Sequence, residues 1–420
     1  MKIPIKNLFS CVGIFFFMLW AYTNAGLSSY VYPSINIKIL SVLLSVVMIY
    51  CAYAHDWERK SKGFRTSDIL FIMTIPVILF NNHNFEHNNY SVEIAYIALV
   101  VSYYYLSRMH FWSNQLKNMV FIGGAIFGGV TVVCYFSRSF YADLIWPLFV
   151  KNNVYNDLLI NYDKGYIAGL TNHISSNGMY LAISCGFVAC YLFLGRKTLL
   201  KKVFLIMLVF ALLLTGKRAH VLFTAGSLYL TYLVYMADKP KSRLVKGIGI
   251  ILGVTVVFLI ASRFVPGMDN FVEKFAETSE SGDITKGRAN QVYLALGLFS
   301  SNPIFGIGWD GFKYWFLTNF GVFLNVHNVY VQLLCETGIL GSLVFYTLFI
   351  VEARHAVVAL KRAKCVYYDD PVLNCTTAVS CFVQFFFLLY CMTGNPLYDP
   401  PILYPYIFSC ALTDYVFDND

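Results

Sequence analysis

Charged residues are scarce in this chain of 420 residues. They make up 13% of it, whereas hydrophobic residues make up 58% and the mean hydropathy is +0.60. Soluble domains carry roughly 25% charged and roughly 45–50% apolar residues. The shortage of charge therefore excludes an ordinary soluble protein and places the chain in a membrane. The net charge of +8 does not by itself indicate nucleic acid, because its meaning depends on where the charges lie.

Motifs for metal, disulfide and nucleotide chemistry are also missing. The 11 cysteines include no Cys-x-x-Cys and lie almost all in apolar runs, which indicates buried hydrophobic side chains. The first outer segment, near 25–36, holds no acidic residue, and the sole Asp-x-Asp is Asp418-Asn419-Asp420 at the C-terminus. The glycines of 306–311 are closer to a cluster of turns than to a phosphate-binding loop. We therefore expect no metal ion and no other cofactor.

Long apolar runs fill most of the chain. A helix that crosses a bilayer needs roughly 20 mainly apolar residues, and on this criterion about twelve spans are predicted. They lie at about 7–24, 37–54, 68–82, 92–107, 118–137, 176–194, 202–216, 219–236, 245–263, 327–352, 372–392 and 399–416. The expected fold is all-α, a polytopic integral membrane protein forming one membrane domain over 1–420. The first span could be a cleaved signal peptide, but its apolar run is long for one and a retained helix is preferred.

The distribution of Lys and Arg predicts the orientation in the membrane. With the N-terminus placed in the cytoplasm, most of the 31 Lys and Arg residues fall in inner segments, and every short inner loop carries at least two. The outer loop 83–91 carries none. Both termini are therefore expected in the cytoplasm. Membrane topology explains the positive charge, and no nucleic-acid partner is expected.

Two outer segments, at about 138–175 and 264–326, are much longer than the other outer loops. Loops longer than about 12–15 residues are usually functional or disordered. Trp309, Trp315 and Tyr314 argue against disorder in the second loop. The stretch 291–301 is amphipathic, which predicts a short helix on the outer membrane face. An enzyme acting on lipid-linked substrates would hold its reactive groups in such loops.

Basic residues and one histidine are predicted to meet at this outer face. Lys217 and Arg218 lie between two spans, Arg288 lies in the second long loop, and His327-Asn328 closes that loop. A guanidinium binds phosphate oxygens in a bidentate manner, best where water is scarce. An imidazole, with an ordinary pKa of about 6.5, can accept a proton from a sugar hydroxyl. The pattern suits a lipid pyrophosphate anchored at the interface.

Some of these residues also have a structural interpretation. Lys217 could reach the lipid headgroups and do nothing more. His220, inside a span, is interpreted as a core histidine with its hydrogen bonds satisfied. Glu336 follows His327 by nine residues, so a continuous helix puts it on the opposite face, which predicts a role in helix packing. The Gly338–Gly341 pair is expected to admit a neighbouring helix.

Two motifs carry a family resemblance. His327-Asn328 is followed by nine residues and then Gly-x-x-Gly, and 218–222 reads Arg-x-x-x-Leu. Together they resemble the bacterial O-antigen polymerase and O-antigen ligase superfamily, and 302–308 is similar to the stretch that precedes its His motif. The similarity covers roughly 200–345. Members are polytopic inner-membrane enzymes that move a glycan from undecaprenyl pyrophosphate to an acceptor hydroxyl, without a nucleotide sugar or a metal.

The resemblance implies a role for each site residue. Arg218 and Arg288 would bind the pyrophosphate, and His327 would activate or position the acceptor hydroxyl; these three are the predicted catalytic residues. Lys217 and Asn328 are predicted to bind substrate. The implied partners are an undecaprenyl-pyrophosphate-linked oligosaccharide, a glycan acceptor and the bilayer, with a chain-length regulator and a flippase as further candidates.

Polymerase and ligase activities both remain open. The segment 393–399, Thr-Gly-Asn-Pro-Leu-Tyr-Asp, looks more like the polymerases, whereas the combination of the two motifs is usually described for ligases. A polymerase of O-antigen, capsule or exopolysaccharide is preferred. A lipid-linked oligosaccharide flippase is less favoured, because no duplicated halves or broken helix pairs are evident and the cations are predicted at the interface beside long loops.

Overall fold

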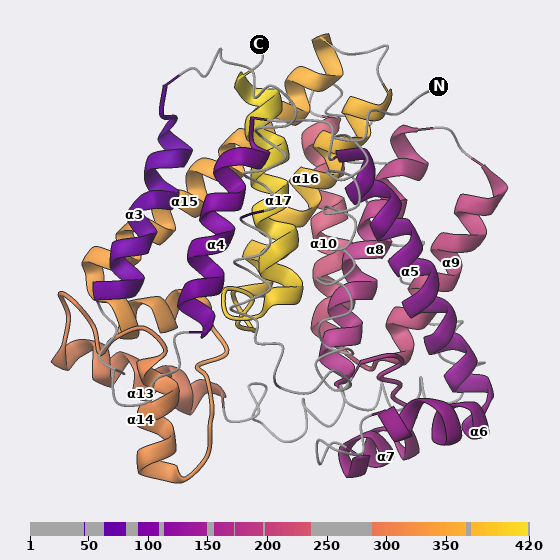
Figure 1. The fold of residues 1–420 in the computed structure, drawn as a ribbon, viewed down its shortest axis with the longest axis horizontal. Coiled ribbons are helices and arrows are strands. Elements are labelled where there is room, and N and C mark those ends of the chain that lie inside the picture. The colour runs from indigo at the N-terminus through magenta and orange to yellow at the C-terminus, as the bar shows by residue number, and fades with distance from the viewer. Residues whose placement is uncertain are drawn as a thin grey trace.

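The structure is a computed structural model of the 420-residue chain. It describes residues 46, 63–80, 91–108, 113–148, 155–171, 173–195, 198–236, 288–366 and 371–418. Within these ranges all regular secondary structure is helical (Figure 1). The predicted all-α fold is therefore confirmed for the described part of the chain.

Every predicted span that falls on described residues coincides with a helix. These helices are α3 (Thr66–Phe80), α4 (Ser91–Leu106), α5 (Ser113–Phe136), α8 (Ile174–Leu194), α9 (Leu199–Leu214), α10 (Arg218–Tyr235), α15 (Val329–Val366), α16 (Pro371–Tyr390) and α17 (Pro400–Asp418). The spans predicted at 7–24, 37–54 and 245–263 lie outside the described residues, residue 46 excepted.

Three of the described helices are long and apolar enough to cross a bilayer. They include the stretches Leu116–Phe136, Ile174–Leu194 and Val329–Lys364, and the apolar parts of α3, α4, α16 and α17 are shorter. Their length and composition identify the chain as an integral membrane protein. The total of about twelve spans stays a prediction.

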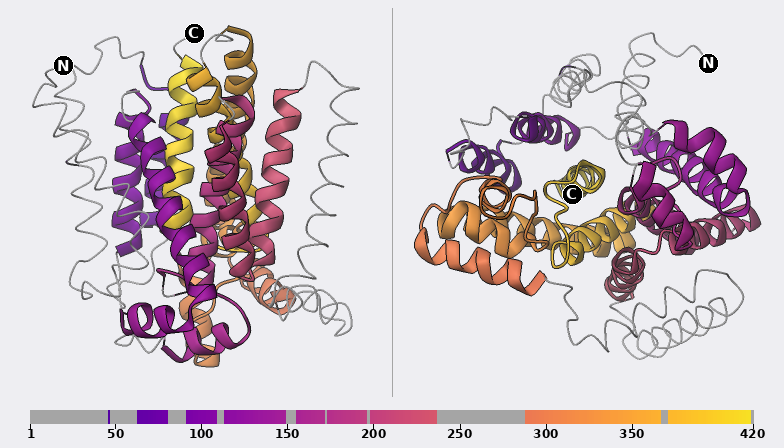
Figure 2. Two further views of the ribbon diagram at one scale, coloured as in Figure 1. Left: turned by 90° about the vertical axis from the view of Figure 1, so that its right-hand side faces the viewer. Right: turned by 90° about the horizontal axis from the view of Figure 1, so that it is seen from below.

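The long helices run side by side as two flanks joined by a central group (Figures 1 and 2). One flank holds α3, α4 and α15, and the other holds α5, α8 and α9. Between them α16 packs against α17, α10, α15 and α8, and α17 also contacts α4. One hydrophobic core fills the space between these helices, and fully buried Phe345, Phe382 and Phe386 lie within it.

The predicted burial of the cysteines is confirmed wherever their side chains are described. The cysteines in question are all buried and free: Cys134, Cys185, Cys190, Cys335, Cys375, Cys381, Cys391 and Cys410. Cys11, Cys51 and Cys365 lie outside the residues whose side chains are described. Burial as small hydrophobic side chains accounts for the cysteines that can be placed.

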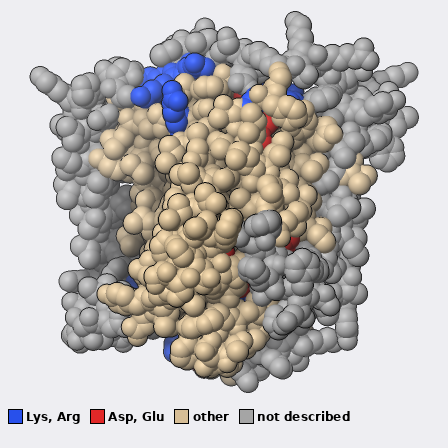
Figure 3. Space-filling model, turned by 90° about the vertical axis from the view of Figure 1, so that its left-hand side faces the viewer, with Lys and Arg blue, Asp and Glu red and all other residues tan. Residues whose placement is uncertain are grey.

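The two long loops build short helices at one end of the bundle. The first loop forms α6 (Arg138–Phe140) and α7 (Tyr155–Asp163), and the second forms α13 (Arg288–Ser301) and α14 (Gly311–Phe320) (Figure 1). The helix predicted at 291–301 is therefore confirmed. The C-terminus lies at the opposite end, where Lys and Arg side chains gather above a flank nearly free of charge (Figure 3).

One glycine breaks α15. Gly338 has φ 63° and ψ −167°, a conformation essentially restricted to glycine. A break of this kind leaves amides and carbonyls without partners inside the helix. The segment 303–308 of the second long loop supplies the missing partners. It does so through hydrogen bonds from the Ile307 amide to the Cys335 carbonyl (3.0 Å), from the Gly308 amide to the Glu336 carbonyl (2.9 Å), and from the Ile339 amide to the Pro303 carbonyl (2.9 Å).

The expectation that Gly338 and Gly341 admit a neighbouring helix is confirmed for Gly341 and wrong for Gly338. Gly341 does admit a helix, because a Cβ there would lie 2.6 Å from Val77 of α3. Gly338 does not: a Cβ there would lie 2.3 Å from the carbonyl oxygen of Ile304. Its close neighbour is loop backbone, which sequence spacing could not reveal.

Gly338→Ala is therefore expected to destabilise the protein. An alanine cannot adopt this backbone conformation cheaply, and strain of this kind costs roughly 1–3 kcal/mol before the clash with Ile304 is added. The matched control is Gly297→Ala in α13, where a Cβ would meet no atom within 4 Å. Thermal unfolding of the purified protein in detergent should show a lower midpoint for Gly338→Ala alone. Equal midpoints for the two variants would contradict the role given to the helix break.

Candidate functional site

The turn between α9 and α10 places two of the basic residues. Gly216 has φ 66°, and a Cβ on it would lie 2.2 Å from the Tyr166 ring, so this turn needs glycine. Tyr166 belongs to the first long loop, whose Ile167 amide donates to the Leu214 carbonyl at 2.9 Å. Lys217 is the N-cap of α10 and Arg218 is its first residue. The first long loop therefore holds the turn that carries both cations.

His327 lies in the loop just before α15 begins. Its φ of 55° is unusual for a residue other than glycine, and such outliers often occur at functional sites. The next residue, Asn328, caps α15: its Oδ1 accepts from the Val331 amide at 3.1 Å. The Asn328 side-chain amide donates to the Met392 carbonyl at 3.2 Å. The hydrogen bonds of Asn328 therefore fix the backbone direction at His327, just before the helix begins.

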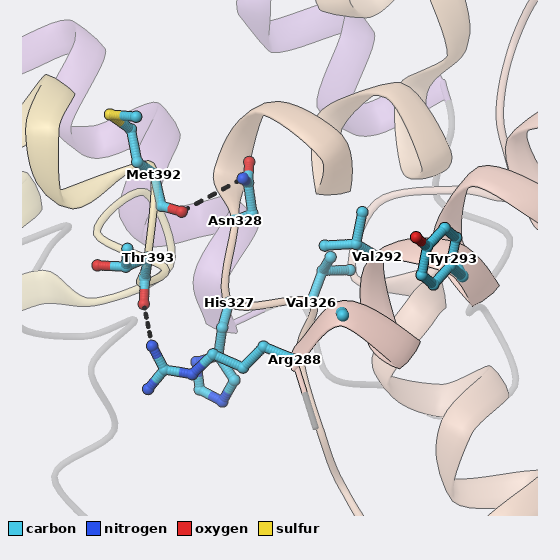
Figure 4. Close-up of a pocket in the computed structure, with 9 residues that line it drawn as sticks. Arg288, Val292, Tyr293, Val326, His327, Asn328, Met392 and Thr393 are labelled. Carbon is cyan, nitrogen blue, oxygen red and sulfur yellow. Dashed lines mark hydrogen bonds between the residues drawn. The ribbon is translucent and has the colours of Figure 1, made fainter. Parts of the chain in front are cut away.

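Arg288, the first residue of α13, reaches across to the α16–α17 loop. Its Nη1 donates to the Thr393 carbonyl at 3.2 Å (Figure 4). Arg288 and His327 line one cavity of about 460 Å³. The other lining residues are Ala289, Val292, Tyr293, Val326, Asn328, Met392 and Thr393. No carboxylate is among these described residues, and Figure 4 shows the Arg288 guanidinium beside the His327 ring.

The site is electropositive. Burial, together with the charges of Arg288 and Lys217, lowers the pKa of His327 to about 4, so its imidazole is neutral at pH 7. Burial and the charge of Arg288 also lower the pKa of Lys217. Within the described residues no carboxylate forms a salt bridge with Lys217 or Arg288. Such a cluster is completed by an anion.

Glu336 holds the second long loop against α15. Its carboxylate accepts from the amides of Asp310 (3.0 Å) and Phe312 (3.3 Å) and from the Gln332 side chain (2.9 Å). The Tyr398 hydroxyl makes a fourth, short hydrogen bond to it. Asp310 and Phe312 stand at the N-terminus of α14, so the predicted role of Glu336 as a hydrogen-bonding group in helix packing agrees with the structure. Glu336 pins loop backbone, because the helix break brings 303–312 against this side of α15.

The α16–α17 loop, residues 391–399, contributes to the site; the similarity of 393–399 to the polymerases did not predict its contacts with the site residues. Met392 and Thr393 offer backbone carbonyls to Asn328 and Arg288, and Tyr398 bonds Glu336. Backbone carbonyls leave no mark in a sequence. The one available signal is Gly394-Asn395-Pro396, a turn-forming run between two spans.

The structure brings most of the predicted site residues to one end of the bundle. Lys217, Arg288 and His327 are close enough for their charges to interact. Asn328 lines the cavity and also caps α15. Arg218 lies next to Lys217 and is half-buried, but it does not line the cavity.

The interpretation of His220 as a satisfied core histidine needs a correction. Its side chain is buried, at 1% exposed, but neither ring nitrogen has a hydrogen-bond partner among the described residues. The ring sits over Gly178, where a Cβ would lie 2.6 Å from Nδ1, and it makes an edge contact with Tyr390 at 5.0 Å. The Arg-x-x-x-Leu motif thus carries an unsatisfied imidazole one turn into α10.

The pKa of His327 gives a pH-dependent prediction. Because the pKa is lowered to about 4, the imidazole should stay neutral as the pH falls through 6.5 and take up a proton only near pH 4. Arg288→Gln removes one of the charges that lowers it, so the pKa should rise. Histidine-labelled protein observed by NMR, with His327→Gln to assign the signal, would measure both values. The control is Lys202→Gln at the far end of α9, which should change nothing.

Glu336→Gln tests the pinning of the loop. The four groups that contact the Glu336 carboxylate all donate hydrogen bonds to it, whereas a glutamine presents an NH₂ donor in place of one oxygen. At least one buried donor therefore loses its acceptor, which lowers the free energy of unfolding by roughly 1–3 kcal/mol. The thermal midpoint should fall, whereas Asp143→Asn on the exposed side of the first loop should leave it unchanged. An unchanged midpoint for Glu336→Gln would mean that the carboxylate is not needed as an acceptor.

Comparison with protein-family models matches residues 202–346 to the family described as O-antigen ligase. No curated protein matches the chain. The matched region begins within α9 and ends within α15, so it contains Lys217, Arg218, Arg288 and His327 but not the α16–α17 loop. The long apolar helices indicate an integral membrane protein. Residues 202–346 match an O-antigen ligase domain, and this match supports membership of the O-antigen polymerase and ligase superfamily, whose members are glycosyl-transferring enzymes.

Proposed function

We propose that the protein is a surface-polysaccharide polymerase. It transfers a glycan from undecaprenyl pyrophosphate to a hydroxyl of another lipid-linked repeat unit at the outer face of the bacterial plasma membrane. The observation that carries this proposal is the cavity at the loop end of the bundle, in which Arg288 lies beside a neutral His327 and none of the described lining residues is a carboxylate. The match to the O-antigen ligase family supports it.

The cations are proposed to hold the donor. Arg288 has guanidinium nitrogens beyond the one bonded to Thr393, and these can bind phosphate oxygens in a bidentate manner. Lys217 adds a second charge from the α10 end, and Arg218 lies beside it. Cations placed in this way stabilise the negative charge that develops on the pyrophosphate as it leaves. They do this work in the proposed reaction without a metal ion.

His327 is proposed to accept the proton of the acceptor hydroxyl. The acceptor oxygen forms a bond to the anomeric carbon, the bond from that carbon to the pyrophosphate breaks, and the proton passes to His327. The lowered pKa of His327 makes the imidazole neutral but a weak base. A bound pyrophosphate offsets the charges of Arg288 and Lys217, so its arrival should raise the pKa of His327. Base strength would then increase when the donor is present.

The charge distribution supports an outward-facing site. Lys and Arg side chains gather at the end of the bundle where the C-terminus lies (Figure 3), and the cavity lies at the opposite end. Positive charge marks the cytoplasmic side of membrane proteins. The proposal therefore places the C-terminus in the cytoplasm and the cavity at the periplasm or outer surface. Both long loops would lie on that outer side.

A ligase is the second candidate. It would transfer the finished polymer to the lipid A core, and the description of the matched family favours it. The polymerase is preferred because the segment 393–399, which resembles the polymerases, contributes to the cavity through Thr393 and to the Glu336 cluster through Tyr398. A flippase is less favoured because the cations lie at one end of the bundle. A chain-length regulator and a separate flippase would be the partners of the polymerase in the cell.

Alanine at Arg218, Arg288 or His327 should abolish glycan chain growth in a deletion strain complemented with each variant. The variants lose phosphate binding or the proton acceptor, and at least a hundredfold loss is expected for each, since general base catalysis alone contributes about 10²–10⁴. The control is Arg138→Ala, an exposed arginine of the first long loop paired weakly with Asp163 at 3.7 Å. Immunoblots should show equal protein levels. Normal chain length in all three variants would overturn the assignment.

The glycan profile of the deletion strain separates polymerase from ligase. Loss of a polymerase should leave a single repeat unit on the acceptor, because ligation continues without chain growth. Loss of a ligase should leave long chains on undecaprenyl pyrophosphate and a bare acceptor. Gel electrophoresis of the lipopolysaccharide or capsule, with mass spectrometry of the lipid-linked pool, distinguishes the two outcomes.

A further inference from the structure

A second group of titratable side chains lies at the opposite end of the bundle from the cavity. Glu352 and His355 stand one turn apart on α15, and Asp414 faces them from α17. Each can offer one ligand atom, and these atoms all lie within 4.8 Å of one another. Glu352 is fully buried and Asp414 is 1% exposed. Neither the family match, which ends at residue 346, nor the proposed reaction uses this cluster.

The Glu352 carboxylate accepts no hydrogen bond of ordinary geometry from the described residues. Both of its carboxylate oxygens are buried, and neither is hydrogen-bonded by any described residue. Ser67 and Cys410 lie beside it, but neither bonds it in normal geometry. Buried carboxylates in proteins are paired, hydrogen-bonded or bound to metal. The carboxylate is therefore aimed into the cluster with its bonding capacity unused.

The nearby cation is already engaged. Arg108 forms a salt bridge with Asp68 at 2.6 Å. The Nδ1 of His355 lies 2.8 Å from the Oδ1 of Asp414 and 3.3 Å from the Ser67 hydroxyl oxygen, and the other Asp414 oxygen accepts from the Tyr103 hydroxyl. Two carboxylates thus face one imidazole with no further described base to balance them.

We propose that Glu352, His355 and Asp414 form a binding site for a divalent cation of the Mn²⁺ and Zn²⁺ class. Such an ion would balance the two carboxylates and use both the idle Glu352 oxygens and the His355 nitrogen. One imidazole with two carboxylates favours these ions over Mg²⁺, which prefers oxygen ligands and retains water. Two ligand atoms that each lie about 2.1 Å from one ion are at most about 4.2 Å from each other. The ligand atoms of the three side chains therefore need to approach one another only slightly.

The helix geometry supports this assignment. A carboxylate and a histidine three residues apart project from one face of a helix, and in four-helix bundles that hold metal in their cores this spacing is used for ligands. The His355 Nδ1 lies 2.8 Å from the Asp414 Oδ1, so the ligand atoms of the two helices already lie close together. The ion would link α15 to α17. The expectation that no metal is present rests on the first outer segment, near 25–36, and does not bear on this end of the bundle.

Metal content of the purified full-length protein tests the proposal. Untagged protein in lipid nanodiscs is stripped with EDTA, loaded with MnCl₂ or ZnCl₂, separated from free ion and measured by mass spectrometry of its metal. The wild type and the control Glu93→Gln, which alters another buried glutamate on α4, should retain about one ion per chain. Glu352→Gln and Asp414→Asn should retain less than about a tenth of that amount. The bound ion should also raise the thermal midpoint of the wild type but not of Glu352→Gln.

Two results would overturn the proposal. One is the absence of bound ion in the wild type, which together with a higher midpoint for Glu352→Gln would mean that the cluster holds a proton instead. The other is full retention of the ion by Glu352→Gln. If Asp414→Asn does not fold, His355→Gln serves in its place, and its affinity for Mn²⁺, followed by electron paramagnetic resonance, should fall at least tenfold. Neither result depends on the glycan-transfer activity.

Discussion

The break in α15 at Gly338 is the constraint on which the outer end of this protein depends. Within a membrane, a broken helix persists only if other protein groups satisfy its free amides and carbonyls. Here the segment 303–308 does so through backbone hydrogen bonds, and Glu336 then binds the amides that follow it in the loop. The arrangement turns a long polar loop into a part of the helix bundle. It also sets the position of α13, and with it Arg288.

The candidate site is electropositive because no described carboxylate lies in its wall. Arg288, Lys217 and His327 come from three separate elements, and no described carboxylate neutralises them. Their mutual repulsion and their burial work in the same direction, since both favour the neutral imidazole. Much of the support for this cluster is backbone: the carbonyls of Met392 and Thr393 orient Asn328 and Arg288. An anion of the right size would relieve the repulsion.

Two helices connect the two ends of the molecule. α15 begins beside His327 and carries Glu352 and His355 beyond its break, while α17 follows the α16–α17 loop and ends near Asp414. One end is rich in uncompensated positive charge, and the other holds buried carboxylates that exceed their described partners. Each end therefore favours the binding of a ligand whose charge is opposite to its own. The hydrophobic core between the ends keeps the two sites apart.

The sequence by itself determined the membrane class, the helical fold and the residues that bear charge at the site. Hydropathy and composition carry this information because the bilayer demands long apolar helices. Through the family resemblance it also predicted that Arg218, Arg288 and His327 act in one site. Only the tertiary structure decided how Glu336, His220 and the α16–α17 loop take part. The reason is that the sequence predicted a continuous helix at 327–352, whereas the break at Gly338 admits the segment 303–308 beside α15 and so brings loop backbone to Glu336. Carbonyl groups that orient Arg288, and a carboxylate left without a partner at Glu352, arise from long-range packing and leave no local signal in the sequence.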